Sequence, residues 1–191
     1  MKREELILVN EDDEAIGVEE KITAHLNGAL HRAFSLFIFN SDGQLLVQKR
    51  TSTKYHSKSL WSNTCCGHPR PGESIEAASR RRLSEEMGFD CGVEKVFEFV
   101  YRVKLDNGFY EHEYDHVLVG KFDGTPAPNH NEVDDWDWAN LKKIRLDMQA
   151  HPDNYTYWFR ISIDELCRSV KSSKSLGIYD LLSHDCDNVP S

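Results

Sequence analysis

The chain has 191 residues, of which 39% are hydrophobic and 29% charged, and its formal net charge is −9. This composition is typical of one globular domain with a sizeable core, and it fits neither an intrinsically disordered chain nor a membrane-spanning one. The acidic balance argues against a general nucleic-acid binder, which would carry a basic face, but a local group of Lys and Arg side chains can still bind an anion.

The N-terminal residues 1–5 carry charge and are not followed by the apolar core of a signal peptide, so a cytoplasmic location is expected. The longest apolar stretch, residues 34–39, is too short to cross a bilayer. The five cysteines include no CxxC pair, and in the absence of a secretory signal they are expected to be free thiols, of which one could be reactive.

The first half of the chain is expected to form strands. Residues 6–9 and 16–18 read as short strands on either side of an acidic turn. The apolar run 34–39, the turn Asn40-Ser41-Asp42-Gly43 and a second strand over 44–50 predict a β-hairpin.

A loop and a helix follow. The glycines and prolines within residues 51–73 predict a structured loop. A helix is expected over residues 74–87, because Ser74 is a suitable N-cap and Gly88 stands where a glycine commonly ends a helix.

Strands resume after the helix, at about 94–104 and 110–122 with a turn at Asp106-Asn107-Gly108, and again at 132–138. The stretch after Asn140 is expected to be mostly helical. Helices inserted among antiparallel strands predict a sandwich of the α/β or α+β class, with mixed and antiparallel sheets flanked by helices. We expect a single domain over residues 1–183 and a polar tail over 184–191.

The run from Gly67 to Phe89 carries the strongest functional signal. It resembles the Nudix box, a loop–helix–loop that holds a divalent metal against a diphosphate. On a helix, Arg81 and Glu85, and likewise Arg82 and Glu86, are four residues apart and can pair on one face. Such pairs would orient carboxylates as oxygen ligands for Mg²⁺, which also takes substrate phosphate oxygens.

One position departs from that pattern. Nudix hydrolases have a glutamate directly after the arginine of this helix, and this chain has Arg82 there. The hydrolase metal cluster is therefore short by one acid, which weakens diphosphate hydrolysis as the activity and leaves diphosphate binding intact.

A second set of candidate ligands flanks the box. Glu111 and Glu113 are two apart on an expected strand, so their side chains share a face. His25, His31 and His68 supply three imidazoles, and such mixed ligation suits Mn²⁺, Zn²⁺ or Mg²⁺. Taken singly, each histidine fits a structural or exposed role better, and the constellation is informative only as a whole.

Over about residues 5–165 the chain resembles the type I isopentenyl diphosphate isomerases. The resemblance is carried by motifs in the same order and spacing: Glu20-Lys21, His25, His31, Gln48-Lys49-Arg50, Lys54, Trp61-Ser62-Asn63, Cys66-Gly67-His68-Pro69, Arg81-Arg82-Leu83, Glu86, Glu111-His112-Glu113 and Tyr157-Trp158-Phe159.

That resemblance implies roles for individual residues. The ligands of a tightly held metal would be His25, His31, His68, Glu111 and Glu113. A second Mg²⁺, arriving with the diphosphate, would be held with the help of Glu86. The phosphates would be contacted by Lys21, Arg50, Lys54 and Arg82. The acid–base pair would be Cys66 and Glu113, with Tyr101 close to the glutamate.

The implied reaction needs such groups. Protonating an unactivated double bond creates a tertiary carbocation, which requires an acid, a base and a water-free pocket. Nearby cations are expected to favour the thiolate of Cys66. Trp158 could face the cation with its π-cloud, although core packing explains that residue almost equally well.

Several residues are expected to lie outside the chemistry. Cys65 is interpreted as a packing residue, and His112 should point away from the two glutamates. Asp115 shares their face and is expected in a salt bridge or in solvent. Surface positions are expected for His56, His130, His151 and His184, and a half-buried strand for Trp136 and Trp138.

Two other functions remain open. A Nudix hydrolase of nucleoside or prenyl diphosphates would use Glu73, Glu85 and Glu86 but leaves Cys66 and the histidines unexplained. A non-catalytic diphosphate-binding module has no use for a positioned cysteine. The expected partner is a small prenyl diphosphate, with neither nucleic acid nor membrane, and the protein is a monomer or a homodimer.

Overall fold

The computed structural model describes residues 4–54, 56–105 and 107–172. Its strands are β1 (Glu5–Val9), β2 (Ala15–Glu20), β3 (His31–Phe39), β4 (Gln44–Arg50), β5 (Trp61–Ser62), β6 (Cys65–Gly67), β7 (Val93–Lys104), β8 (Tyr110–Lys121) and β9 (Val133–Asn140). Its helices are α1 (Lys21–Asn27), α2 (Ile75–Met87), α3 (Leu141–Ala150), α4 (Tyr157–Ser172) and the short 3₁₀ helix η1 (Pro152–Asn154). In these ranges no helix has the length and apolar character needed to span a membrane.

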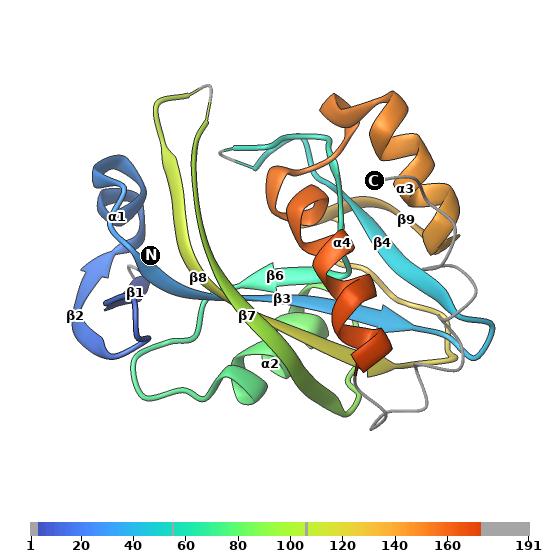
Figure 1. The fold of residues 1–191 in the computed structure, drawn as a ribbon, viewed down its shortest axis with the longest axis horizontal. Helices are drawn as coiled ribbons and strands as arrows, with labels where there is room; N and C mark the ends of the chain where they lie inside the picture. Colours follow the sequence, from blue (N-terminus) through green and yellow to red (C-terminus); the bar gives the residue numbers. More distant parts are fainter. Residues whose placement is uncertain (1–3, 55, 106, 173–191) are drawn as a thin grey trace.

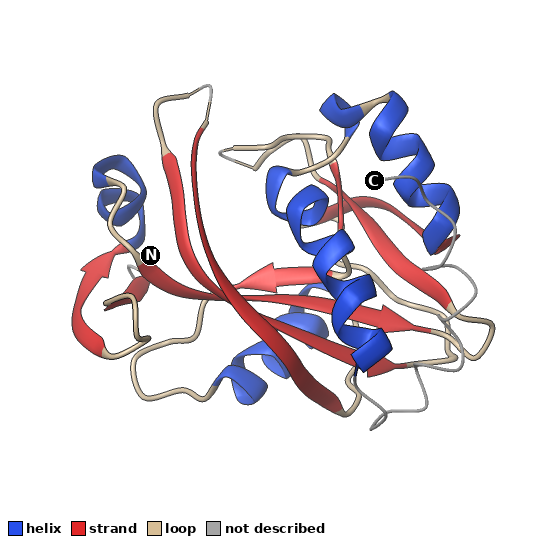
Figure 2. Ribbon diagram, in the orientation of Figure 1, coloured by secondary structure: helices blue, strands red, loops and turns tan. Residues whose placement is uncertain are grey.

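The strand β3 is the centre of the sheet. It pairs in parallel with β8 from His31 opposite Glu113 to Phe39 opposite Lys121, and antiparallel with β1, β4 and β6. All other strand pairs are antiparallel, so the described strands form one mixed sheet (Figure 2). The predicted mixed, helix-flanked α/β fold is confirmed.

Side chains alternate along β3 and build a core on each face of the sheet. Phe37 and Phe39 join one cluster with residues of α3 and α4, whereas Leu36 and Ile38 join another with residues of α2. The sheet is therefore a layer between α2 on one face and α3 and α4 on the other (Figure 1). This near-complete burial of β3 explains why its sequence is an apolar run rather than an alternating one.

The predicted hairpin of β3 and β4 is confirmed at its turn, where the amide of Gly43 donates to the carbonyl of Asn40 at 3.0 Å. The two strands pair only at Phe39 and Leu45 and then diverge. Beyond that point β4 pairs with β9 on one side and with β5 on the other. The hairpin is thus open, a feature that local sequence does not reveal.

The helix α2 begins and ends as predicted. The Ser74 hydroxyl accepts a hydrogen bond from the amide of Ala77 at 3.2 Å, and Gly88 has φ 74°. A Cβ at Gly88 would come within 2.2 Å of the carbonyl oxygen of Ala127, so glycine is required both for the left-handed conformation and for the close approach.

The loop predicted over residues 51–73 contains two short strands, β5 and β6. The second matters for the site, because β6 pairs with β3 and places Cys66 opposite Ser35. The later strands were predicted close to their observed bounds. Asp106 of the predicted turn lies outside the described residues, and so does the predicted tail over 184–191. The 1–183 domain boundary therefore stays a prediction.

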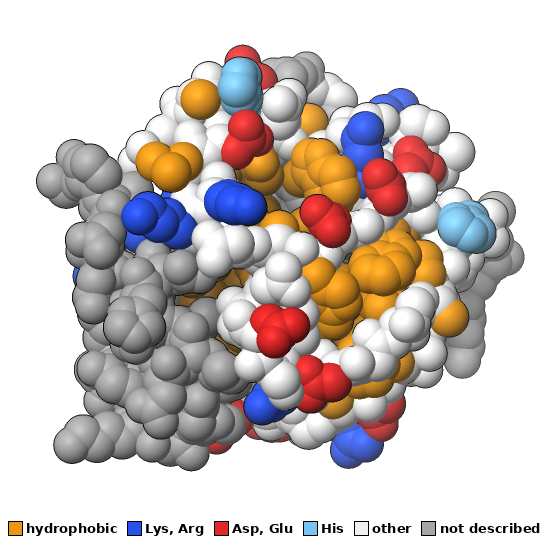
Figure 3. Space-filling model, turned by 90° about the vertical axis from the view of Figure 1, so that its right-hand side faces the viewer, with side chains coloured by type: hydrophobic (Ala, Val, Ile, Leu, Met, Phe, Trp, Pro, Cys, Tyr) orange, Lys and Arg blue, Asp and Glu red, His pale blue; other side chains and the backbone are white. Residues whose placement is uncertain are grey.

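Seen from the side of Figure 1 that carries α3, the surface shows apolar side chains interspersed with acidic and basic ones (Figure 3). Among the larger apolar side chains exposed in the described ranges, Leu146 of α3 is 46% exposed.

Candidate active site

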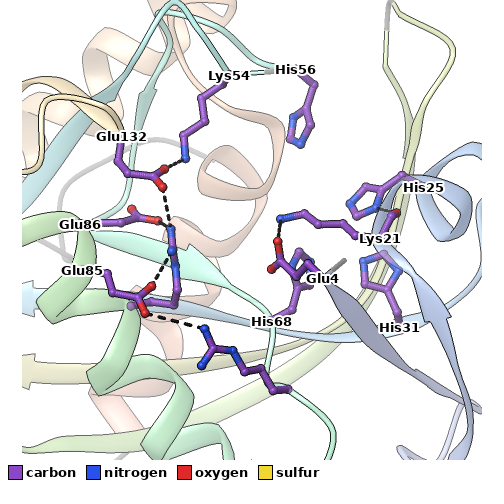
Figure 4. Close-up of polar contacts among 12 residues, drawn as sticks. Glu4, Lys21, His25, His31, Lys54, His56, His68, Glu85, Glu86 and Glu132 are labelled. Atoms are coloured by element: carbon purple, nitrogen blue, oxygen red, sulfur yellow. Dashed lines mark hydrogen bonds and ion pairs between the residues drawn. The ribbon is translucent and has the colours of Figure 1, made fainter. Parts of the chain in front are cut away.

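A cavity of about 400 Å³ lies between the N-terminal segment, the loop after β4, and α2. Its wall combines basic side chains from the sequence analysis with the candidate metal ligands and Cys66. Ten of the predicted site residues line this cavity although they come from separate elements (Figure 4). His25, His31 and Tyr101 are not part of the lining and join the site through contacts with Glu111 and Glu113.

One end of the cavity holds the histidine–glutamate cluster. Ligand atoms of His25, His31, His68 and Glu113 all lie within 4.8 Å of one another. Each comes from a different element: α1, the first residue of β3, the segment after β6, and β8. The parallel register sets His31 directly opposite Glu113, so the sheet itself brings this pair together.

Glu111 lies on the same face of β8 as Glu113 but groups with other partners. Its Oε2 atom is 3.3 Å from Nε2 of His25, and its Oε1 atom is 3.0 Å from Nε2 of His56. The ligand atoms of these three residues also lie within 4.8 Å of one another. The cluster therefore has two overlapping groups that share His25.

The donor set fits a divalent cation. Nε2 of His31 and Oε2 of Glu111 are buried and accept or donate no hydrogen bond among the described residues. Buried polar atoms are almost always hydrogen-bonded, and leaving them unsatisfied is costly. Mixed imidazole and carboxylate ligation of a divalent ion would satisfy these atoms.

Protonation in the cluster also suits ligation. Burial lowers the pKa of His68 to about 4, so its imidazole is neutral at neutral pH. Burial opposes ionisation of Glu113, but the adjacent imidazoles of His31 and His68 outweigh it and hold its pKa well below the usual value. A neutral imidazole next to a carboxylate is the state that binds a metal ion.

Glu113 is also the meeting point with the candidate acid–base residues. The Tyr101 hydroxyl donates to its Oε2 atom at 2.6 Å, as the resemblance implied. Its Oε1 atom is 3.0 Å from Nε2 of His68. Both carboxylate oxygens are therefore held in fixed positions at the wall of the cavity.

Cys66 lies on β6 with its thiol held by two neighbours. Its Sγ donates to Oδ1 of Asn63 at 3.1 Å and lies 3.6 Å from Oγ of Ser35. Burial, together with the nearby carboxylate of Asp115, raises the pKa of the Cys66 thiol to about 12. The expectation that nearby cations favour the thiolate was wrong for the protein's own side chains, because carboxylates rather than cations surround the sulfur.

The four predicted phosphate contacts are spread along the cavity: Lys54 lies with Glu86 and Glu132 away from the histidines, whereas Lys21 lies beside His25 (Figure 4). Lys21 pairs with Glu4 at 3.0 Å, and Lys54 pairs with Glu132. Arg50 lies over the ring of Trp158, 5.2 Å from its centroid. These four cations all line the cavity, together with the carboxylates that pair with three of them.

Arg82 lies on α2 and also lines the cavity. It forms ion pairs with Glu86 and, at 2.7 Å, with Glu85. Glu86 is 4% exposed and accepts a hydrogen bond from Gln48 at 2.9 Å. The predicted pairing of Arg82 with Glu86 is confirmed, and Glu86 is held as a carboxylate at the cavity wall.

The remaining pair of α2 is formed by Arg81 and Glu85, neither of which lines the cavity. Arg81 contacts Glu85 at 3.4 Å, as predicted, but its shorter contact is to Glu73 at 2.7 Å. This second pair ties the helix to the loop before it. Trp158 is 4% exposed; it belongs to the core and also lines the cavity. Its position is therefore compatible with core packing and with a role at the substrate.

Two residues were misplaced by the sequence analysis. His56, expected at the surface, is 8% exposed and contacts Glu111. Asp115, expected in a salt bridge or in solvent, is fully buried and accepts a hydrogen bond from Ser35 at 2.7 Å. The burial of Asp115 could have been predicted from its shared strand face with Glu111 and Glu113. The polar residues around His56 in the sequence gave no indication that it would be buried.

Other expectations for bystander residues held in the described ranges. Cys65 is fully buried in the core, and Nδ1 of His112 contacts the carbonyl of Gly28 on the opposite face at 2.9 Å. His130 and His151 are exposed, and Trp136 and Trp138 are half-buried. Cys65, Cys66, Cys91 and Cys167 are free thiols, while Cys186 and His184 lie outside the described residues.

Comparison with known proteins gives three findings. The NUDIX domain family model matches residues 29–159. "Isopentenyl-diphosphate Delta-isomerase 2" of Aromatoleum aromaticum is 48% identical over 172 residues, covering 89% of this chain and 91% of that protein. "Isopentenyl-diphosphate Delta-isomerase 2" of Photorhabdus laumondii is 53% identical over 161 residues, covering 84% of this chain and 91% of that protein.

Solved structures agree on the fold. A crystal structure from Deinococcus radiodurans superposes with a TM-score of 0.71 at 22% identity and covers 85% of this chain and 98% of that one. The MutT protein of Methanosarcina mazei superposes with a TM-score of 0.61 at 18% identity and covers 73% of this chain and 94% of that one. At these identities the likeness concerns the fold alone.

Proposed function

The chain belongs to the Nudix family and, within it, to the isopentenyl-diphosphate Delta-isomerases, and we propose that it moves one proton across the allylic system of its substrate with Cys66 and Glu113. The enzyme interconverts isopentenyl diphosphate and dimethylallyl diphosphate. The observation that carries the mechanism is that Cys66 and Glu113 line the same cavity as the cationic side chains.

The two residues divide the proton transfer. One donates a proton to the terminal carbon of the double bond, and the other removes a proton from the neighbouring methylene. Cys66 enters as the thiol, since burial and Asp115 raise its pKa to about 12. The roles exchange when the reaction runs in reverse, because the same path is followed in both directions.

Tyr101 and Trp158 assist this transfer. The hydroxyl of Tyr101 donates to Oε2 of Glu113 at 2.6 Å and so fixes the carboxylate that faces the substrate. The ring of Trp158 lies at the cavity wall, where its π-face stabilises the developing carbocation by about 2 kcal/mol once water is excluded. Its indole N–H donates to the Ser62 hydroxyl at 3.1 Å, which holds the ring in place.

Four cationic side chains of the cavity are proposed to bind the diphosphate. Lys21, Arg50, Lys54 and Arg82 would donate to its oxygens, exchanging some of their present carboxylate partners for phosphate. Glu86 would share a Mg²⁺ ion with the diphosphate, since its carboxylate is already ionised and held at the wall. The grouping of these four cations in one cavity would let an acidic protein bind an anionic substrate.

The histidine–glutamate cluster would hold a divalent ion, proposed as Mn²⁺, Zn²⁺ or Mg²⁺, through His25, His31, His68, Glu111 and Glu113. When bound, the ion would supply positive charge beside Glu113, which favours the carboxylate form that accepts a proton when Cys66 donates one. Hydrolysis is disfavoured because Arg82 occupies the position of a hydrolase acid and pairs with Glu86. A cytoplasmic location and a prenyl diphosphate as the small-molecule partner remain part of the proposal, for a protein that is a monomer or a homodimer.

The proposal is tested by incubating the protein with isopentenyl diphosphate and Mg²⁺ and separating the products. We expect an allylic diphosphate, recognised by its rapid breakdown in acid, and no release of phosphate. Phosphate or isopentenyl monophosphate as the product would instead establish a hydrolase. Binding of substrate without any product would establish a non-catalytic module.

A further inference from the structure

His56 belongs neither to the Nudix box nor to the ligand set that the resemblance implies, yet it lies at the metal cluster. It comes from the segment between β4 and β5 and is 8% exposed. Figure 4 shows its ring pointing from that segment toward the side of the cavity where His25 lies. A buried imidazole needs hydrogen-bond partners within the protein, so the role of His56 must be sought in the groups around its ring.

The contact of His56 is with a carboxylate and not with the main ligand group. Its Nε2 atom is 3.0 Å from Oε1 of Glu111, whose other oxygen is 3.3 Å from Nε2 of His25. The group formed by His25, His31, His68 and Glu113 does not include His56, which belongs with Glu111 and His25 to the second, overlapping group. His56 therefore reaches the centre through Glu111.

The partners of the two ring nitrogens select one tautomer of neutral His56, because a carboxylate can only accept whereas a hydroxyl can donate or accept. Nδ1 of His56 lies 3.2 Å from Oγ of Ser57, whose hydroxyl can donate to it. With Nδ1 accepting, the proton lies on Nε2, which then donates to Oε1 of Glu111. Oε2 is left with no hydrogen bond among the described residues, as a ligand atom should be.

We propose that His56 is a positioning residue, which fixes Glu111 so that one of its oxygens faces the metal ion. Carboxylates that ligate metals are themselves hydrogen-bonded in most sites, and loss of such a partner typically weakens metal binding about 10- to 100-fold. The inference rests on the proposed function, because it assumes that the cluster holds a divalent ion.

The same residue connects the two ends of the cavity. Its backbone carbonyl accepts a hydrogen bond from Nη2 of Arg50 at 3.4 Å, and its ring meets Trp158 edge-on with centroids 6.0 Å apart. Lys54 lies two residues before it on the same segment. The segment that presents Lys54 and accepts a hydrogen bond from Arg50 therefore also holds a carboxylate of the metal cluster.

The test compares two amides that differ in reach. In His56→Gln the amide nitrogen can occupy the place of Nε2 and donate to Glu111, whereas in His56→Asn it is one methylene too short. Metal-stripped proteins are titrated with Mn²⁺ alone, by calorimetry and by electron paramagnetic resonance of free Mn²⁺. His130→Asn, at an exposed position, is the matched control, and circular dichroism of the metal-free proteins checks folding.

We expect His56→Asn to bind Mn²⁺ about 10- to 100-fold more weakly than the unaltered protein, and His56→Gln to recover most of that loss. Equal affinity in His56→Asn would overturn the inference while leaving the metal centre in place. Failure of His56→Gln to recover would also overturn it, because His56 would then be a direct ligand. If the unaltered protein bound no Mn²⁺, the metal centre itself would fall and this inference with it.

Discussion

The two ends of the cavity are built on opposite principles. At the arginine end, Arg81, Arg82, Glu85 and Glu86 lie on one helix and neutralise one another through contacts three or four residues apart. At the histidine end, the candidate ligands come from α1, β3, β8 and the segment after β6, and buried ligand atoms such as Nε2 of His31 make no hydrogen bond in the described chain.

This difference separates stability from function. The arginine end is electrostatically complete without any ligand, so its charges hold the helix and loop in place and are available for exchange with phosphate. The histidine end is incomplete by itself, and each unsatisfied buried polar atom costs about 1–3 kcal/mol. A bound cation should therefore stabilise the histidine end strongly and the arginine end little.

The largest expected effect is on the proton transfer at the boundary of the two ends. Cys66→Ala should lower turnover by about 10²–10⁴-fold, because it removes one of the two proton-transfer groups. Binding of the substrate diphosphate should persist, since no cation is altered. The matched control is Cys91→Ala, outside the cavity, and near-normal turnover by Cys66→Ala would contradict the assignment.

Removal of metal should destabilise the histidine end and leave the arginine end unchanged. Chelation should lower the free energy of unfolding by about 2.7 kcal/mol relative to protein at a metal concentration of a hundred times the Kd. Protease cleavage near His25 should increase, because α1 loses its tie to the cluster. Cleavage within α2, at the arginine end, should stay unchanged. Equal susceptibility at both ends, with and without metal, would break the comparison.

Substitution at the arginine end should affect binding more than stability. Arg82→Gln removes a charged donor to the diphosphate, worth about 1.5–3 kcal/mol, and should raise KM roughly 10- to 100-fold with a smaller change in kcat. Arg80→Gln is the control, because Arg80 is exposed and pairs with Asp90 outside the cavity. A fall in kcat alone would place Arg82 in the chemistry instead.

The smallest effect concerns the ion pair of Glu73 and Arg81. The hydrogen bond from Arg81 lowers the pKa of Glu73 below 4.5, so the pair contributes stability above about pH 4.5 and loses it as the pH falls through the folded-state pKa. Glu73→Gln should be less stable by about 1 kcal/mol at neutral pH. Urea unfolding should show this difference shrinking in acid, and a difference that grew in acid would contradict the sign.

Local spacing was sufficient to predict much of the fold and the arginine end. The cap at Ser74, the stop at Gly88 and the pairing of Arg82 with Glu86 are all contained within one stretch of chain, where helix geometry determines the contacts. The shared face of Glu111 and Glu113 followed from strand alternation in the same way.

What the sequence could not reveal depends on long-range packing. The role of His56 arises only when the segment after β4 folds over the strand that carries Glu111. The environment of Cys66 was misjudged because pairing of β6 with β3 brings Ser35 and the buried Asp115 beside the sulfur. Neither contact involves neighbours in sequence, and burial, which decides both, is not a local property.

Proton nuclear magnetic resonance of the protein with isopentenyl diphosphate and Mg²⁺ in D₂O tests the central claim most directly. Two groups that exchange their protons with solvent should yield dimethylallyl diphosphate with deuterium in a methyl group. Product formed without deuterium would contradict proton transfer by two separate exchangeable residues, and an unchanged substrate spectrum from metal-loaded protein would contradict the isomerase itself.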